Sequence, residues 1–220
     1  MKHTFKKIIL LAFFTTISTV IFAQGTEWGV KTGLNMATQV PINHISSDNT
    51  RTGIYAGLFV DHTFNKFFGI QGEILYSMMG QVWKYRTVEY STLGEEPGMG
   101  YPYSYYYYGQ ETTGTIKTDY IVLPVLAKLY VTKNLSLDLG PQFGYMVNSN
   151  FEGYSYDESY GDYKALYYNN KFDVSFGMGL SYKLGKFDVS GRCNLGLTKI
   201  NKIGGAKNNV IQFGVGYRLK

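Results

Sequence analysis

The chain has 220 residues, with 26 glycines, 21 tyrosines, 17% charged residues and a formal net charge of +5 at pH 7. Three of its 21 basic residues and none of its 16 acidic residues lie in the first 23 positions, so the rest of the chain carries 18 basic against 16 acidic residues, or +2. This balance does not favour nucleic-acid binding, which needs a clustered basic face, and the single cysteine, Cys193, excludes an intramolecular disulfide.

The first 23 residues have the order of a secretory signal peptide. Three lysines precede an apolar run from Ile8 to Phe14, and the segment ends at Ala23. The apolar run is too short to be a membrane-spanning helix. We therefore predict residues 1–23 as a signal peptide that is removed by cleavage, and residues 24–220 as one mature domain.

After this segment, large apolar residues alternate with small or polar residues in eight runs. In the last run, Ile211, Phe213 and Val215 alternate with Gln212 and Gly214. Because side chains alternate across a strand, each run has one apolar face and one small or polar face. Most runs have ten residues or more, which suits tilted membrane strands better than the shorter strands of a sandwich. The predicted strands are roughly 26–37, 53–64, 68–79, 116–131, 135–148, 171–184, 187–197 and 209–219.

The apolar face of these runs carries no Lys, Arg, Asp or Glu. A charge on a lipid-facing position costs roughly 2–4 kcal/mol at mid-depth, so a membrane would select this absence. The opposite face is rich in glycine, which suits a narrow interior better than the solvated face of a soluble sandwich or barrel. Aromatic residues gather at the ends of the apolar faces, where membrane barrels carry aromatic girdles. Those residues are Trp28, Phe64, Phe68, Tyr182, Phe187 and Tyr217 at one rim, and Tyr76, Tyr145 and Phe172 at the other.

Short and long connections alternate along the chain. The short ones are 65–67, 132–134 and 185–186, and the long ones are about 38–52, 80–115, 149–170 and 198–208. Short turns on the periplasmic side and long loops outside are the arrangement of outer-membrane barrels. The fold predicted is an all-β, eight-stranded, antiparallel, up-and-down transmembrane barrel.

The short turns also predict which inward residues are neighbours. The 185–186 turn places Lys183 opposite Asp188, and the 132–134 turn places Lys128 opposite Asp138, as two buried pairs. Glu73 and Arg192 are expected to meet near the middle of the barrel. An eight-stranded barrel is just wide enough to be filled by side chains, so these residues form a plug network rather than a wide pore. The predicted polar network of the lumen comprises Gln71, Glu73, Lys128, Asp138, Gln142, Lys183, Asp188 and Arg192.

With strands and loops placed, the chain resembles the small porin-family outer-membrane β-barrel domain, the PorT-like group. The motifs that carry the resemblance are Gly29 to Asn35, Gln71 to Ser77, Tyr120 to Val125, Gly140 to Gln142 and Gly214 to Leu219. One departure is the ending, since Leu219 and Lys220 follow Tyr217 where many such barrels finish on an aromatic residue. The resemblance implies the fold and a location in the outer membrane of a Gram-negative cell, because the motifs belong to the barrel itself. It implies little about activity.

The long connections carry the most distinctive composition, tyrosine with serine and glycine. Tyrosine supplies a large amphipathic contact area at low entropic cost, so we interpret these loops as a binding or adhesion surface for a surface protein, a glycan or lipopolysaccharide. The alternative is that the tyrosines lie on strand extensions that rise above the membrane, and both can hold. The candidate binding residues are Tyr101, Tyr103, Tyr105, Tyr106, Tyr107, Tyr108, Tyr154, Tyr156 and Tyr160.

Enzymatic and cofactor chemistry find little support in the sequence. His44 lies near Ser46, Ser47 and Asp48, but a catalytic triad is recognised by geometry and not by proximity in sequence. Separated histidines and one thiol give no metal-site spacing. We predict no catalytic, cofactor or metal residues. A structural or secretion-assembly barrel and a narrow porin-like channel stay open as alternatives.

Two prolines fall within predicted strands. Pro124 and Pro141 each lack the backbone N–H that a strand donates to its neighbour. A closed barrel has no free edge, so we predict a bulge or local bend at each.

Overall fold

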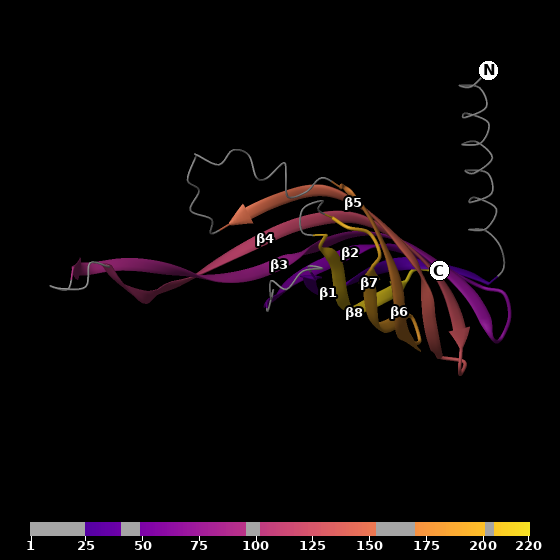
Figure 1. Cartoon of the computed structure of the whole chain (residues 1–220). Helices are drawn as coiled ribbons and strands as arrows, with labels where there is room; N and C mark the ends of the chain where they lie inside the picture. The colour runs from indigo at the N-terminus through magenta and orange to yellow at the C-terminus, as the bar shows by residue number, and fades with distance from the viewer. Residues whose placement is uncertain (1–24, 41–48, 96–101, 153–169, 201–204) are drawn as a thin grey trace, which may run out of the picture.

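The computed structural model describes residues 25–40, 49–95, 102–152, 170–200 and 205–220 as a closed antiparallel barrel (Figure 1). Its strands are β1 (Thr26–Val40), β2 (Asn49–Thr63), β3 (Phe68–Glu95), β4 (Pro102–Tyr130), β5 (Leu135–Glu152), β6 (Phe172–Leu184), β7 (Phe187–Gly196) and β8 (Lys207–Arg218). Each strand pairs with the next in the chain, and β8 returns to pair with β1. The predicted eight-stranded up-and-down barrel is confirmed. The predicted signal peptide, residues 1–23, lies outside the described residues.

Three short turns join β2 to β3, β4 to β5 and β6 to β7, and the local sequence explains each. The side-chain oxygen of Asn65 accepts hydrogen bonds from two following backbone N–H groups, at 2.9 and 3.0 Å. The hydroxyl of Thr132 does the same in the second turn, at 3.3 and 3.0 Å. Gly185 has φ +61°, a backbone conformation that favours glycine. We call this end of the barrel the turn end and the opposite end the loop end.

Strands β3 and β4 are much longer than the predicted strands 68–79 and 116–131, and the alternative of strand extensions is confirmed for this pair. The connection predicted over about 80–115 is wrong for most of its length, because β3 runs to Glu95 and β4 begins at Pro102. Pairing with β2 ends at Asn49↔Val82, and pairing with β5 ends at Thr115↔Glu152. Beyond those points the two strands pair, in the described residues, only with each other, and they project from the loop end as a two-stranded ribbon (Figure 1). We call residues 83–95 and 102–114 the arm.

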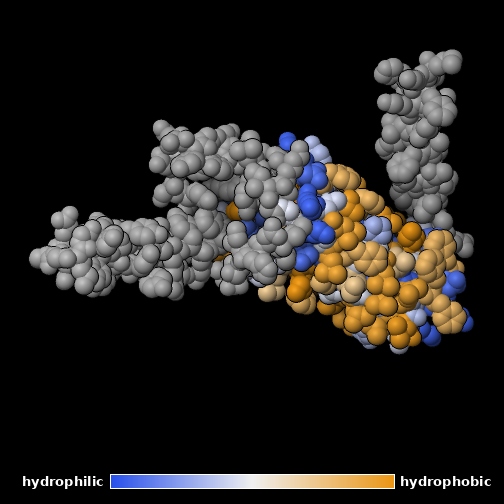
Figure 2. Space-filling view, viewed as in Figure 1, coloured by the Kyte–Doolittle hydropathy of each residue, from blue (hydrophilic) through white to orange (hydrophobic). Residues whose placement is uncertain are grey.

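The outer face of the barrel is apolar. Figure 2 shows hydrophobic residues covering the barrel wall on the visible side. The side chains of Leu34, Ile54 and Leu180 are 53–55% exposed, values typical of the outward set. Aromatic side chains predicted for the turn-end rim are exposed and contact one another: Phe64 and Phe68 stack with ring centroids 5.6 Å apart. The predicted assignment of faces is therefore confirmed. In the described part of the chain, no helix has the length and apolar character needed to cross a membrane.

Large side chains fill the inside of the barrel. Tyr55, Leu75, Met79 and Tyr120 are at most 2% exposed and form part of one apolar cluster toward the loop end. A Cβ added at Gly214 would lie 1.8 Å from the Tyr55 hydroxyl oxygen, although Tyr55 is on β2 and Gly214 on β8. The glycine therefore makes room for the Tyr55 side chain, which lies over Gly33 of β1 and reaches β8.

The two prolines are accommodated without the predicted bulges. The β3–β4 register keeps the same offset from Gly72↔Val125 to Leu75↔Val122, on either side of Pro124. Pro141 lies in an unshifted register opposite Phe176. Of the predicted bulge or local bend, the bulge is wrong at both prolines, because a missing N–H removes one hydrogen bond without requiring an extra residue in the ladder. The local bend stays a prediction.

Candidate functional site

Three charged side chains from three strands meet inside the barrel. The carboxylate of Glu73 on β3 accepts hydrogen bonds from the guanidinium of Arg192 on β7 at 3.0 and 2.8 Å, and its Oε1 lies 2.8 Å from Nζ of Lys31 on β1. All three residues are 5–6% exposed. The predicted contact between Glu73 and Arg192 is present, and Lys31 joins it. Because two cations share one carboxylate, losing the carboxylate would leave both without a counter-charge in the interior.

A second charged group lies nearer the turn end. Nζ of Lys128 lies 3.1 Å from Oδ2 of Asp61 and donates to Oε1 of Gln71 at 2.8 Å. The predicted register, Lys128 opposite Asp138, is present. The predicted ion pair is wrong, because Asp138 accepts hydrogen bonds from two serine hydroxyls instead. Register fixes Cα neighbours, whereas a long lysine side chain can reach an acceptor on another strand.

The charged residues at the rim of the turn end are also paired differently from the prediction. Lys183 is opposite Asp188 in register, but its Nζ donates to both carboxylate oxygens of Glu27, at 2.7 and 2.8 Å. Asp188 accepts from Arg218 Nη2 at 2.8 Å. The Lys183 and Glu27 side chains are 35% and 37% exposed, so the predicted burial of Lys183 is wrong.

Toward the loop end, neutral amides form a hydrogen-bonded chain. Asn194 donates to Gln212 at 2.8 Å, Gln212 donates to Asn35 at 2.8 Å, and Asn35 donates to the Ser77 hydroxyl at 2.7 Å. The buried carboxylate of Asp173 also lies at this end, where it accepts hydrogen bonds from the Thr198 hydroxyl at 2.8 Å and from Asn208 at 3.2 Å. Gln142 is buried, and its side-chain oxygen has no hydrogen-bond partner among the described residues. Two of the eight predicted lumen residues, Asp138 and Gln142, therefore have no described hydrogen bond or ion pair to a charged partner.

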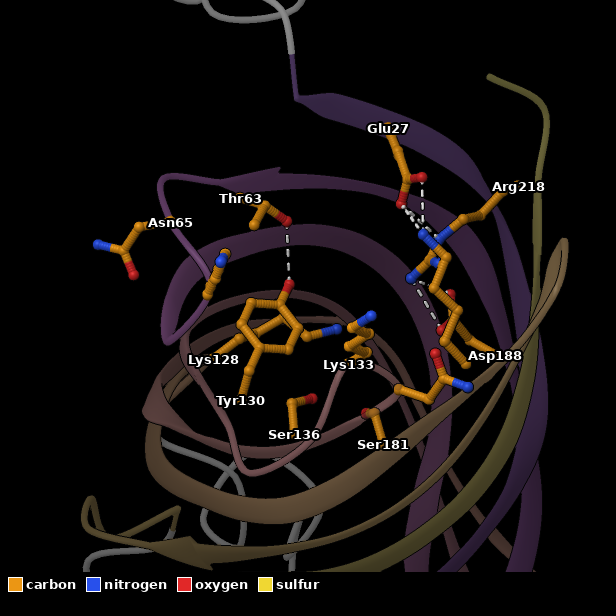
Figure 3. A pocket seen from close by; sticks show the side chains of 13 residues that line it. Glu27, Thr63, Asn65, Lys128, Tyr130, Lys133, Ser136, Ser181, Asp188 and Arg218 are labelled. Atoms are coloured by element: carbon orange, nitrogen blue, oxygen red, sulfur yellow. Dashed lines mark hydrogen bonds and ion pairs between the residues drawn. The ribbon is translucent and has the colours of Figure 1, made fainter.

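A cavity of about 420 Å³ opens at the turn end, and residues of all but one strand contribute to it. Figure 3 shows polar side chains around its edge, with the hydroxyls of Thr63 and Tyr130 joined at 3.1 Å on one side and Glu27, Arg218 and Asp188 on the other. The lining comprises Glu27, Thr63, Asn65, Lys66, Lys128, Tyr130, Lys133, Asn134, Ser136, Ser181, Lys183, Asp188 and Arg218. We call this cavity the turn-end pocket.

The turn-end pocket has a closed floor. Beneath it lies a space of only about 10 Å³ between Lys31, Phe59 and Gln71, which is at the lower limit for holding one water molecule. Phe59 is 2% exposed and Glu73 lies among its cations in the same part of the lumen. The described side chains therefore leave a blind pocket rather than an open passage.

The tyrosines predicted for binding lie on the arm or outside the described residues. Tyr103 and the run Tyr105 to Tyr108 lie on the backbone of β4, where the register pairs Tyr106 with Tyr90 and Tyr105 with Ser91. The structure describes the backbone of these tyrosines but not their side chains. Tyr101, Tyr154, Tyr156 and Tyr160 lie outside it altogether, as do His44, Ser46, Ser47 and Asp48. In the described residues, no three His, Cys, Asp or Glu side chains gather as a metal site would require.

Four further charged residues lie in the charged part of the lumen but were absent from the predicted network: Glu27, Lys31, Asp61 and Arg218. The sequence pattern could have identified them, because each occupies an alternate position of its predicted strand that faces the barrel interior. Parity shows that a residue faces inward, but it does not show which residues it contacts across the barrel.

Comparison with known proteins identifies the family. The family model described as outer membrane protein beta-barrel domain matches residues 22–202. The chain belongs to this family. It is an integral barrel of the Gram-negative outer membrane, and the apolar wall is its lipid-facing surface. No curated protein matches the chain.

Among solved structures, this outer-membrane barrel is similar to the attachment invasion locus protein Ail of Yersinia pestis, with 13% identity over 89% of this chain and 100% of that chain and a TM-score of 0.46. It is also similar to Neisserial surface protein A, with 10% identity, 88% and 97% coverage and a TM-score of 0.45. OprG from Pseudomonas aeruginosa gives 12% identity, 88% and 94% coverage and a TM-score of 0.35.

Proposed function

We propose that this protein is a surface-presenting barrel whose arm contacts a protein, glycan or lipopolysaccharide ligand outside the cell. The observation that carries the proposal is the arm itself. Residues 83–95 pair only with 102–114 in the described ladders, after both neighbouring strands have ended. Thirteen residues of strand extend about 40 Å at roughly 3.3 Å per residue. A ribbon of this length is not needed to close a barrel.

The backbone of the arm supports a binding role. Each arm strand has one edge without a neighbour in the described residues, and unpaired N–H and C=O groups on such an edge can pair with an extended segment of another molecule. The sequence of the arm adds tyrosine-rich composition between Tyr103 and Tyr108, which suits recognition because tyrosine combines apolar area with a hydroxyl.

The filled lumen favours this role over a wide pore. Tyr55, Tyr120 and Leu126 are at most 2% exposed inside the barrel, and the turn-end pocket is closed beneath by Phe59 and the Glu73 group. Eight-stranded barrels have room for side chains, whereas porins with open channels have sixteen or more strands. Steady conductance of the purified protein in a planar bilayer would favour the narrow-channel alternative.

The orientation we propose places the short turns in the periplasm and the arm outside, as in other outer-membrane barrels. We also propose that the barrel belongs to the PorT-like group, because its strand motifs, such as Gly29 to Asn35 and Gln71 to Ser77, resemble those of that group. A structural or secretion-assembly role would use the barrel wall instead of the arm, so the two roles predict different contact residues.

Site-specific crosslinking on intact cells tests the proposal. A photo-crosslinking residue is placed at Tyr105 on the arm or at Leu58 on the wall, where Leu58 is 53% exposed. Crosslinks from position 105 to a surface protein, a glycan or lipopolysaccharide support the proposal. Crosslinks to an envelope protein from position 58 alone support the structural or secretion-assembly role and contradict it.

A shortened variant supplies the matched control. Residues 87–110 are replaced by an Asn-Gly turn that joins the paired residues Arg86 and Glu111. We expect the barrel to fold, because pairing with β2 and β5 ends before the deleted part. Heat-modifiable migration on gels checks folding, and binding to cells or to purified lipopolysaccharide should be lost. Unchanged binding by the folded variant would contradict the proposal.

A further inference from the structure

Two lysines at the mouth of the turn-end pocket lack a partner in the described part of the chain. Lys66 lies in the β2–β3 turn and Lys133 in the β4–β5 turn, and both line the pocket. Both residues are exposed, and neither has an ion pair or side-chain hydrogen bond with a described residue. Figure 3 shows Lys133 at the edge of the pocket together with Lys128 and Tyr130.

The other cations of the pocket have carboxylates beside them. Glu27 lies within 3.0 Å of both Lys183 and Arg218. Asp61 lies 3.1 Å from Lys128 and 3.5 Å from Arg218. Asp188 lies 2.7 Å from Arg218. These three carboxylates serve three cations, and the remaining acid nearby, Asp138, is hydrogen-bonded by serine hydroxyls. The two turn lysines therefore have no carboxylate within ion-pair distance among the described residues.

The rest of the lining supplies further hydrogen-bond donors. Side-chain amides and hydroxyls contribute from Asn65, Asn134 and Tyr130. These neutral groups can donate hydrogen bonds to the oxygens of a bound anion.

We propose that the turn-end pocket binds a small soluble oxyanion with at least two negative charges, carried by phosphate or carboxylate groups. Lys66 and Lys133 provide the two unpaired cations, and the neutral amides and hydroxyls hold the rest of the molecule. A volume of about 420 Å³ lies within the range of small-molecule sites. The strands surround the pocket and its floor is closed, so the ligand enters from the aqueous phase beyond the turns and stays at the mouth.

The third short turn provides a matched control. Lys186 lies in the β6–β7 turn at the same end of the barrel, but it does not line the pocket. Lys186→Gln removes the same charge from the same rim as Lys66→Gln or Lys133→Gln. A general attraction of anions to a positive rim would weaken equally in all three variants, whereas a site in the pocket would not.

Calorimetric titration of the full mature chain tests the proposal, in vesicles of phosphatidylcholine, which carries no net charge. Pyrophosphate and citrate are the probes, and they distinguish a phosphate site from a carboxylate site. An exposed ion pair contributes a factor of up to about five, so the Lys66→Gln, Lys133→Gln double variant should bind roughly tenfold more weakly. Lys186→Gln should change affinity less than about twofold.

Two outcomes would overturn the proposal. One is that neither probe binds the wild-type barrel at low ionic strength. The other is that Lys186→Gln weakens binding as much as the substitutions in the pocket. All variants should show the heat-modifiable migration of the wild type, since the substituted lysines lie in exposed turns. Because the arm is at the opposite end of the barrel, these results do not depend on the function proposed for it.

Discussion

The turn half of the lumen holds ion pairs that join strands across the barrel. The loop half holds an apolar cluster and a chain of neutral amides, and its buried carboxylate, Asp173, is bonded by neutral donors. Lys31, Glu73 and Arg192 meet in the first half, and Tyr55 and Tyr120 belong to the cluster in the second. Side chains fill both halves, but different interactions stabilise each half. Charges need specific partners from other strands, whereas an apolar cluster needs only matching volumes.

The largest effect is expected from breaking the charged half. Glu73→Gln keeps the shape of the side chain but leaves Lys31 and Arg192 buried without a counter-charge. Loss of one partner of a buried ion pair costs about 3–5 kcal/mol, and urea unfolding in detergent should show a loss of this size. A triple variant with Lys31→Met, Glu73→Leu and Arg192→Met should recover most of it, because an apolar group can replace a buried ion cluster. A loss below about 1 kcal/mol for Glu73→Gln would show that the cluster is not held by charge.

The second prediction concerns shape, in the half that depends on volume. A Cβ at Gly33 would lie 2.1 Å from the carbonyl oxygen of Phe213 and 2.8 Å from the ring of Tyr55. Gly33→Ala should therefore destabilise the barrel by about 3 kcal/mol, near the upper end of ordinary overpacking effects. Gly72→Ala is the control, since a Cβ there meets no atom within 4 Å. Equal unfolding midpoints for the two variants would contradict the close packing inferred for the loop half.

The amide chain of the loop half should respond less strongly than the charged cluster. Asn35→Ala removes the acceptor for Gln212 and the donor to Ser77. Unsatisfied neutral groups cost about 1–3 kcal/mol, so we expect a loss of about 2 kcal/mol in the same urea experiment. A loss as large as that of Glu73→Gln would mean that charge does not distinguish the two halves.

The smallest effect is expected at the rim of the charged half. Lys183 and Glu27 form an ion pair but are more than one third exposed. Pairs in contact with water contribute between about zero and 1 kcal/mol, so Lys183→Gln should shift the unfolding midpoint only slightly. The remaining effect should vanish at high salt, because exposed charges are screened. A shift comparable to that of Glu73→Gln would show that depth in the lumen does not set the strength of an ion pair.

Local periodicity was enough to predict most of the barrel. The eight strands, the three short turns and the outward faces follow from alternation with a period of two, which depends on neighbours within one strand. The contact between Glu73 and Arg192 also followed, because both are inward residues near mid-strand. The arm followed only as one of two alternatives, the strand extensions, since the alternating apolar face stops where β3 and β4 leave the barrel wall.

The partners of the charged residues could not be predicted in the same way. Lys128 and Lys183 each lie opposite the predicted acid in register. Each nevertheless binds a carboxylate of a third strand, which is not the strand of that predicted acid. Of the bulge or local bend predicted at Pro124 and Pro141, the bulge is absent for a related reason, since the ladder tolerates a missing hydrogen bond when many others fix the surrounding register.

The sequence by itself determined that this chain forms strands with one apolar and one small or polar face, and that tight turns join alternate pairs of them. Only the tertiary structure decided which inward side chains meet, how far β3 and β4 extend together, and that five cations gather at one pocket. The physical reason is the separation along the sequence of the residues that determine each feature. Strand formation and face polarity depend on residues a few positions apart, whereas contacts across a closed lumen exist only after β8 has paired with β1.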